Sequence, residues 1–180
     1  MLIEISNSVL LIVDIQEKLF SKIKNNEIIK KNSIILSKTF KLLNLPIYLT
    51  EQYPNGLGKT INSLANELKK ISYFEKSSFS CAAESLLTQS LQNQKRNQIL
   101  ISGIETHICV LQSVFDLKQK GFEPFVIQDA VGSRNQNDHN LALKRFSNFD
   151  VNICTTEMVV FELLRNSKHP KFREISQLIK

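Results

Sequence analysis

The chain has 180 residues, of which 42% are hydrophobic and 22% charged, and it contains only five glycines and four prolines. These values exclude a disordered, collagenous or low-complexity protein and fit a single globular domain, which we expect to span residues 1–180. The formal net charge is +6. The basic residues are nevertheless scattered, without the clustered stripe or motif of a nucleic-acid-binding protein, so we expect no nucleic-acid partner.

The N-terminal segment MLIEISNSVLLIVDIQ lacks the basic stretch of a secretory signal, and Asp14 interrupts its apolar run. We therefore expect neither a signal peptide nor a membrane span, a cytoplasmic location and no membrane partner. The three cysteines, Cys81, Cys109 and Cys154, are odd in number, widely spaced and without a CxxC pair. In a reducing compartment they are expected to be free thiols.

Short apolar runs rich in β-branched residues alternate along the chain with longer segments of helical periodicity. The expected strands are 9–15, 46–51, 71–76, 99–104, 124–131 and 151–156. In the segments between them, apolar positions recur at the spacing of one helix face: Ile28, Ile35, Thr39 and Leu43, then Leu86, Leu87 and Leu91, then Val110, Val114 and Leu117. Several strand runs are apolar on both faces, which indicates helices on both sides. The order predicts a doubly wound α/β domain with a parallel sheet of about six strands.

Three reactive side chains follow or close strands of this expected sheet. Asp14 ends the first strand, Lys76 ends the third, and Cys109 comes shortly after the fourth. In open parallel sheets, ligands bind in the crevice beyond the carboxyl ends of the strands. The three side chains are therefore candidates for a common site.

Cys109 is predicted to lie near the start of a helix, with Thr106 as the N-cap and Gly121 as the stop. The helix N-terminus and Lys76 would favour a thiolate, whereas an ionised Asp14 would oppose it unless it accepts the thiol proton itself. From these residues alone, Cys109 could equally be a small buried hydrophobe and Lys76 a surface residue. Asp14 is harder to dismiss, because a carboxylate at a buried strand end needs a partner.

The segments VLLIVDIQEKLF, FEKSSFS, ILISGIETHICVLQSVFDLKQKG, DAVGSR and TTEMVVFELL resemble, in their order and spacing, the isochorismatase-like cysteine hydrolase family. LTEQYPNGLG and the tail HPKFREISQLIK are similar to the subgroup of isochorismatase domain-containing proteins. The resemblance implies a Rossmann-like three-layer α/β/α sandwich with a mostly parallel, roughly six-stranded sheet. It also implies a catalytic triad of Asp14, Lys76 and Cys109, in which the cysteine attacks a carbonyl and forms a thioester that water hydrolyses.

The same resemblance implies a cis peptide bond between Ile104 and Glu105, with the backbone N–H groups of Glu105 and Cys109 forming an oxyanion hole. Nicotinamidases of this family hold a metal through an Asp-x-His pair and a further histidine after the second strand. Here that strand ends in LTEQYPNG, with no histidine. We therefore expect no catalytic metal, no cofactor and no nicotinamidase activity.

Gln16, Tyr53 and His107 are candidate pocket residues, although Gln16 could instead cap the next helix and His107 could be a surface residue. We interpret Phe20 and Phe79 as core residues. Asp129 and Arg134 are interpreted as strand-end and loop residues that could form a pair, and Cys81 and Cys154 as structural.

The leading hypothesis is a metal-independent cysteine hydrolase, amidase-like, that acts on a small amide or related acyl compound. The alternatives on the same fold are a thiol-based redox sensor and a non-catalytic binding protein. The resemblance and the paired apolar helices also suggest a homo-oligomer with a small-molecule substrate.

Overall fold

The computed structural model describes residues 1–69 and 71–180. Its strands are β1 (Ser8–Val13), β2 (Ile47–Gln52), β3 (Ser72–Lys76), β4 (Gln98–Ile104), β5 (Glu123–Gly132) and β6 (Asn152–Cys154). They form one sheet in the order β3-β2-β1-β4-β5-β6, and every pairing is parallel. The predicted parallel sheet is confirmed. The strands expected from the sequence differ from the observed ones by at most two residues at each end.

The helices alternate with the strands along the chain. The α-helices are α1 (Glu17–Phe20), α2 (Asn26–Leu42), α3 (Pro54–Leu57), α4 (Asn62–Glu67), α5 (Ser85–Asn93), α6 (Leu111–Gln119), α7 (Gln136–Asn148), α8 (Thr156–Leu164) and α9 (Phe172–Ser176). Short turns of other types are η1 (Ile5–Asn7), η2 (Cys81–Ala83) and the π-helical turn η3 (Thr106–Val110). No helix in the described part of the chain is both long and apolar enough to span a bilayer.

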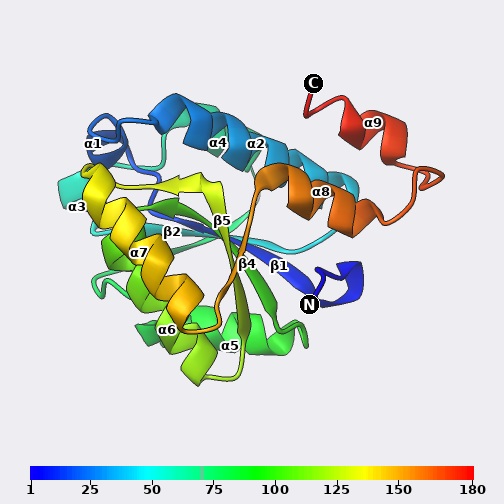
Figure 1. Ribbon diagram of the computed structural model, residues 1–180. Helices are drawn as coiled ribbons and strands as arrows, with labels where there is room; N and C mark the ends of the chain where they lie inside the picture. The colour runs from blue at the N-terminus through cyan, green and yellow to red at the C-terminus, as the bar shows by residue number, and fades with distance from the viewer. Residues whose placement is uncertain (70) are drawn as a thin grey trace.

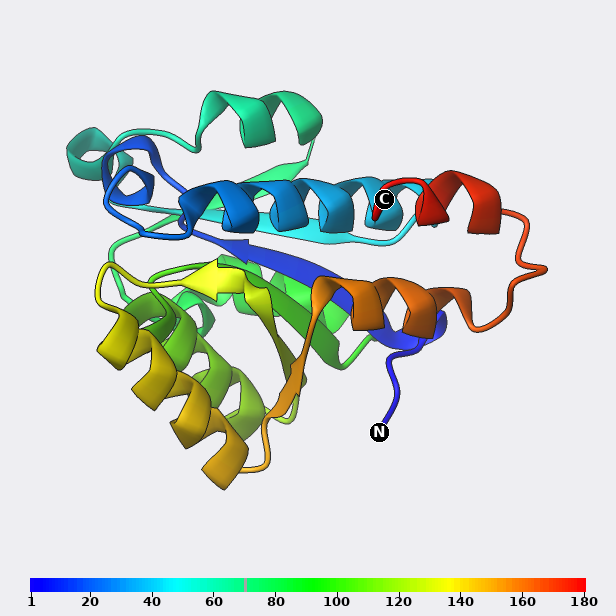
Figure 2. The ribbon, with the colours of Figure 1, turned by 45° about the horizontal axis from the view of Figure 1, so that its top comes forward.

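The sheet is the middle of three layers, as the two views of the ribbon show (Figures 1 and 2). Helices α2, α4 and α8 pack on one face through Leu36, Leu64 and Leu163, among others. Helices α5, α6 and α7 cover the opposite face, where Val114 and Phe146 are fully buried. Strands β1 and β4 lie between two apolar layers and are buried along their whole length, which explains their unbroken apolar runs.

Two helix faces were predicted incorrectly in part. Ile28 of α2 is 55% exposed and Leu86 of α5 is 70% exposed. In each case the neighbouring residue, Ile29 or Leu87, is buried instead. Consecutive residues on a helix point about 100° apart, so only one member of each apolar pair can face the sheet. Gly121 lies just after α6 with a φ of +86°, as expected for the end of that helix.

The strand order places a topological switch point between β1 and β4. From β1 the chain continues outward through β2 to β3, and from β4 it continues the other way through β5 to β6. A crevice forms beyond the carboxyl ends of strands at such a point, and it is the usual ligand site of doubly wound folds. Asp14 follows β1 and Cys109 follows β4, so both lie at this point.

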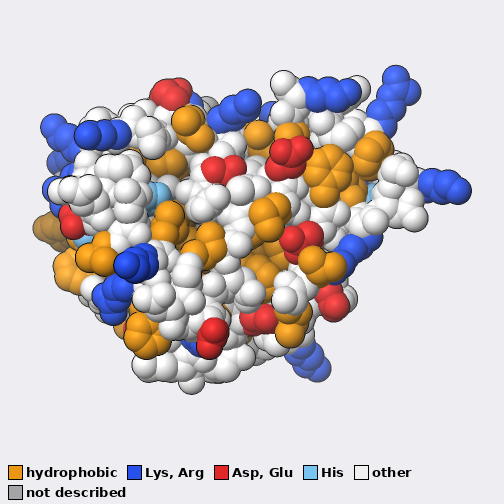
Figure 3. Space-filling model, in the orientation of Figure 1, with side chains coloured by type: hydrophobic (Ala, Val, Ile, Leu, Met, Phe, Trp, Pro, Cys, Tyr) orange, Lys and Arg blue, Asp and Glu red, His pale blue; other side chains and the backbone are white. Residues whose placement is uncertain are grey.

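The face of the molecule in Figure 3 carries its positive charge in a dispersed form. On the face shown in Figure 3, lysine and arginine side chains are spread around the outline and are separated by acidic, apolar and uncharged groups. This face shows no continuous basic stripe.

Candidate functional site

A buried ion pair joins the ends of β1 and β3. Asp14 is the first residue after β1, and Lys76 is the last residue of β3. Lys76 Nζ lies 2.7 Å from Asp14 Oδ2, and both side chains are 0% exposed. Because removing two charges from water costs several kcal/mol per ion, such a pair persists only where additional polar contacts compensate both groups.

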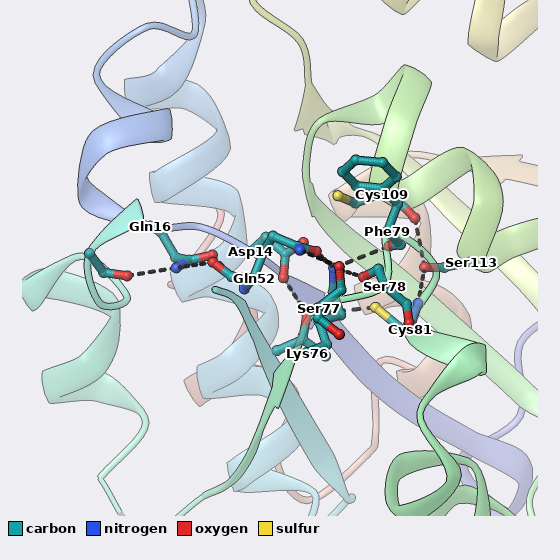
Figure 4. A network of polar contacts seen from close by, with 12 residues as sticks. Asp14, Gln16, Gln52, Lys76, Ser77, Ser78, Phe79, Cys81, Cys109 and Ser113 are labelled. Atoms are coloured by element: carbon teal, nitrogen blue, oxygen red, sulfur yellow. Dashed lines mark hydrogen bonds and ion pairs between the residues drawn. The ribbon is translucent and has the colours of Figure 1, made fainter. Parts of the chain in front are cut away.

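The compensating contacts come from β2 and from the loop after β3. Thr50 Oγ1 donates a 2.7 Å hydrogen bond to the second carboxylate oxygen, Oδ1. The ammonium group donates to Gln52 Oε1 at 2.6 Å and to the backbone carbonyls of Ser78 and Phe79, each at 3.1 Å. Figure 4 shows these groups converging on the ammonium from several segments of the chain. Hydrogen bonds therefore hold both the carboxylate and the ammonium group of the ion pair in place.

Thr50 and Gln52 belong to the site but were not predicted from the sequence to do so. Both lie near the carboxyl end of β2, which is buried at every position. The sequence signal that could have identified them is the presence of polar residues at the end of a strand that is otherwise apolar. Their side chains share the face of the sheet that carries Lys76, because Gln52 is the register partner of Lys76.

Cys109 lies in the π-helical turn η3 and is only 6% exposed. The prediction that Thr106 caps an α-helix here is wrong. The turn begins after Glu105 without a side-chain cap, and Thr106 Oγ1 instead lies 3.0 Å from His139 Nδ1 in a hydrogen bond. The α-helix proper, α6, starts only after this turn. Single π turns inserted before or within α-helices occur frequently at functional sites.

The electrostatics of the site keep the thiol protonated. Burial, followed by the negative charge of Asp14, raises the pKa of Cys109 to about 12, and the positive charge of Lys76 only partly opposes this. Burial likewise raises the pKa of Asp14, although Lys76 acts in the opposite direction. Burial alone would lower the pKa of Lys76, but the negative charge of Asp14 opposes it, and this pKa is also raised. The thiolate that the helix N-terminus and Lys76 would favour is therefore not the resting form, and the opposing effect of Asp14 and burial dominates.

Cys81 is a second thiol beside the ion pair. It is fully buried, and its Sγ lies 3.6 Å from Thr50 Oγ1. Ser113 bridges the backbones of the two cysteines, because the Cys81 N–H donates to Ser113 Oγ at 2.8 Å and the Ser113 hydroxyl donates to the Cys109 carbonyl at 2.6 Å. Burial raises the pKa of Cys81 to about 11. The sequence interpretation of Cys81 as structural agrees with its burial, but its place next to the ion pair was not foreseen.

The connection from β4 to η3 passes very close to the end of β1. The peptide bond between Ile104 and Glu105 is cis, at the position that the family resemblance implies. The preceding Gly103 has a φ of +132°, and a Cβ atom there would lie 2.1 Å from the backbone oxygen of Val13. Only glycine permits this approach. Within the described part of the chain, the Glu105 N–H donates no hydrogen bond.

Gln16 and Tyr53 make contacts that do not require a substrate. Gln16 is fully buried, and its amide accepts from the Gln52 N–H at 2.7 Å and donates to the carbonyls of Gln52 at 3.1 Å and Gly58 at 2.6 Å. It joins the end of β1 to β2 and to the loop after α3, and its side chain does not cap α1. Tyr53 is 61% exposed with a φ of 38°, and its ring lies over Gly56.

His107 belongs to a polar cluster between η3 and the loop before α7. Its Nδ1 lies 2.9 Å from Ser133 Oγ and 3.5 Å from Glu105 Oε2, and its Nε2 lies 3.8 Å from Asp138 Oδ2. The Glu105 carboxylate is buried and also forms an ion pair with Arg134 Nε. His107 is therefore partly buried rather than a free surface residue.

Two sequence interpretations are corrected by these contacts. Arg134 does not pair with Asp129, because Asp129 Oδ1 accepts hydrogen bonds from the backbone N–H and the hydroxyl of Thr156, at 2.8 and 3.0 Å. Phe79 is not a core residue, since it is 54% exposed in the short loop that binds the Lys76 ammonium. Phe20, at 8% exposure, is a core residue as expected.

The remaining cysteine lies apart from this site. Cys154 is buried at the end of β6, where its Sγ lies 3.8 Å from the carbonyl of Val126, in agreement with a structural role. All three cysteines are free thiols, as expected. Among residues 1–69 and 71–180, no group of three or more histidine, cysteine, aspartate or glutamate side chains is arranged to hold a metal ion.

Residues 8–158 match the family model of the isochorismatase domain. The chain belongs to the isochorismatase family. This isochorismatase-family protein is 39% identical over 178 residues to isochorismatase family protein 1A of Dictyostelium discoideum, and the match covers 96% of the chain and 86% of the relative. It is 38% identical over 172 residues to isochorismatase domain-containing protein 2 of Danio rerio, with the same coverage.

Among solved structures, the isochorismatase-family chain superimposes on MAR1 ribonuclease from Caenorhabditis elegans with a TM-score of 0.94. The two sequences are 36% identical, and the match covers 99% of the chain and 92% of that structure. The resemblance to the family and its subgroup seen in the sequence is therefore confirmed, and the family indicates a hydrolase fold.

Proposed function

We propose that the protein is a cysteine hydrolase that acts on a small amide or related acyl compound through a thioester on Cys109. The observation that carries this proposal is the buried Asp14–Lys76 pair next to a buried thiol whose pKa responds to both charges. A structural ion pair at a strand end would not need a thiol beside it. Asp14 and Cys109 follow the carboxyl ends of the neighbouring strands β1 and β4, at the switch point where doubly wound folds usually bind their ligands.

The direction of the pKa shifts supports a proton-transfer role for Asp14. Its pKa is raised by burial, so it accepts a proton more readily than an exposed aspartate. The Cys109 thiol, with a pKa of about 12, is not a preformed thiolate. The proton therefore moves from the thiol to Asp14 as sulfur attacks the carbonyl carbon, and Lys76 keeps its charge and holds the carboxylate in place.

The reaction then follows in two balanced steps. The new S–C bond forms, the C–N bond breaks, and the departing amine takes the proton from Asp14. Water next attacks the thioester and gives one proton to Asp14, the acid leaves, and the proton returns to the Cys109 sulfur. The backbone N–H groups of Glu105 and Cys109 are proposed to donate hydrogen bonds to the oxyanion. The Glu105 N–H belongs to the peptide bond with Ile104, and it donates no hydrogen bond to another described residue, which supports this proposal.

The hydrolase is favoured over a redox sensor by the state of the thiol. Sensor cysteines have a low pKa and are accessible to solvent. Cys109 is 6% exposed and its pKa is raised to about 12. A thiol that loses its proton only to an adjacent base suits an enzyme that activates it when a substrate is in place.

Intact-mass spectrometry after incubation with a library of small amides and esters tests the proposal. An acyl adduct on the wild-type protein, located at Cys109 by peptide mapping, together with release of the acid, is the expected result. Cys109→Ala should give neither, whereas Cys154→Ala, which removes a distant buried thiol, should behave as the wild type. Ligand binding without an adduct or product in any variant would support the binding-protein alternative instead.

Two further arms belong to the same experiment. RNA is added as a substrate because the Caenorhabditis elegans structure that the chain resembles is named a ribonuclease. Cleavage that survives Cys109→Ala would contradict the thioester mechanism. Sedimentation of the purified protein measures whether it is a homo-oligomer, which we also propose from the family resemblance.

A further inference from the structure

A groove lies against the reverse face of β2 and β3, away from the Asp14–Lys76 pair. In the sheet register, Gln52 faces Lys76 on one side, whereas the preceding partners, Glu51 and Glu75, face the other side. This side is covered by α4, which lies above β3 in Figure 2. The space between them is a groove of about 500 Å³, and both carboxylates line it.

Glu51 is a buried carboxylate with one oxygen unused. The residue is 6% exposed, and its Oε1 accepts hydrogen bonds from the Thr60 N–H at 2.8 Å and the Thr60 hydroxyl at 2.7 Å. Its Oε2 accepts no hydrogen bond and forms no ion pair with any described residue. It is also not among the fully enclosed polar atoms that lack a partner, so it faces the groove. Buried charges without a partner are costly, so this oxygen is a place where a cation would be stabilised.

Glu75 adds a second negative charge directly opposite the first. Adjacent parallel strands lie about 4.8 Å apart, and like charges facing each other across a pair of strands are destabilising. Glu75 is exposed and has no ion-pair partner within 4.0 Å among the described residues. The chain has a net charge of +6, yet neither carboxylate forms an ion pair with a described residue. A single positive group between them would relieve the repulsion and bind both.

The rest of the lining is mixed: Thr60 and Asn62 are polar, and the other side chains except Lys59 are apolar or aromatic. Leu49, Leu68 and Ile71 contribute side chains to its lining, and the ring of Tyr73, which is 59% exposed, stands next to Glu75 on the same strand face as Glu51. Aromatic rings attract organic cations through their faces. Lys59 is exposed and also lines the groove, but it forms no ion pair with either carboxylate.

We propose that this groove binds a small organic amine, with the ammonium group between Glu51 and Glu75 and an apolar body against Leu68, Ile71 and Tyr73. A divalent metal ion is disfavoured because, among the described residues, no group of three or more histidine, cysteine, aspartate or glutamate side chains is arranged to hold one. The inference does not depend on the proposed hydrolase activity, because the groove and the thiol lie on opposite faces of the sheet.

The test is a nuclear magnetic resonance titration of the full chain with phenethylamine at neutral pH and low salt, with 2-phenylethanol as the uncharged analogue. Saturable shifts of the backbone amides of Thr60, Ala65 and Tyr73 are expected, with a dissociation constant in the millimolar range or tighter. The alcohol should bind at least about tenfold more weakly, because it lacks the charge.

Variants of exposed residues keep the test independent of folding. Glu75→Gln should weaken binding of phenethylamine about tenfold, and Lys59→Gln should strengthen it by removing a like charge from the lining. Glu157→Gln, an exposed carboxylate on α8, is the matched control and should change nothing. Equal binding of the alcohol, or an unchanged affinity in Glu75→Gln, would overturn the proposal. The same shifts produced by magnesium alone, or an altered oligomeric state of Glu75→Gln without amine binding, would also overturn it.

Discussion

Replacing Lys76 by methionine should destabilise the protein far more than its position on an edge strand suggests. At a separation of 2.7 Å the attraction between Asp14 and Lys76 is about 6 kcal/mol with an effective dielectric constant of about 20. Desolvation of the two charges offsets most of this, so the pair as a whole contributes little. Removing the ammonium alone leaves the Asp14 charge buried with neutral partners, the Thr50 hydroxyl and the Cys109 thiol, and we expect a loss of about 3–5 kcal/mol.

The double variant Asp14→Asn with Lys76→Met separates the charge effect from lost packing. Asparagine is chosen because position 14 has a φ of +52°, which asparagine tolerates. The double variant should recover at least about half of the loss, because no unpaired charge remains. Urea unfolding followed by circular dichroism measures each variant. A loss below about 1 kcal/mol in Lys76→Met, or a double variant no more stable than the single one, would refute this reasoning.

The pH dependence of this loss has a definite sign. Burial raises the pKa of Asp14 in the folded protein, and removing Lys76 raises it further. An acid whose folded pKa exceeds its unfolded value stabilises the protein below the unfolded pKa, and this contribution is lost as pH rises through the folded pKa. The gap between Lys76→Met and the wild type should therefore narrow as the solution is made acidic. A gap that widens toward acid would contradict the raised pKa.

The remaining predictions concern the thiol, the glycine turn and Thr50. Iodoacetamide should modify Cys109 slowly at neutral pH, and the rate should still rise with pH near the thiol pKa of about 12. Asp14→Asn should speed the reaction, because it removes a negative charge beside the thiol. A rate that reaches a plateau below pH 9 would contradict the raised pKa. Gly103→Ala should cost more than about 2 kcal/mol, because its Cβ would lie 2.1 Å from Val13 O, whereas Gly121→Ala, with no atom within 4 Å, should cost about 1 kcal/mol. Equal losses in thermal unfolding would show that space at Gly103 is not limiting. Thr50→Val should cost about 1.5–3 kcal/mol through its lost bond to Asp14. Thr39→Val should be nearly neutral in the same urea assay, because the buried Thr39 hydroxyl has no hydrogen-bond partner among the described residues.

The strands were predictable because their apolar runs are continuous and bounded by polar segments. The ends of the strands also located Asp14 and Lys76, which the structure brings into contact. Thr50 and Gln52 were missed because their importance depends on which strands become neighbours, and a single sequence does not show that β2 lies between β1 and β3. The strand order is decided by tertiary packing rather than by local periodicity.

The errors in the helices have a similar origin. Ile28 and Ile29 are both apolar, and periodicity alone did not decide which of them faces the sheet. Thr106 looked like an N-cap because threonine favours that position, but a π-helical turn and a bond to His139 take its place. The capping preference of threonine is overridden here because the chain makes a tight connection beside the crowded end of β1.

Lys76 belongs to β3 and Asp14 follows β1, with β2 between them. Because neighbouring strands lie about 4.8 Å apart, the lysine side chain extends across β2 to reach Asp14. The ion pair therefore links three strands of the sheet. The ion pair cannot form until β3 has paired with β2. Strand β3 is also the edge of the sheet and is largely exposed, so it should open at lower free energy than β1 or β4. We therefore expect the site to open before the hydrophobic layers on either side of β1 and β4 do.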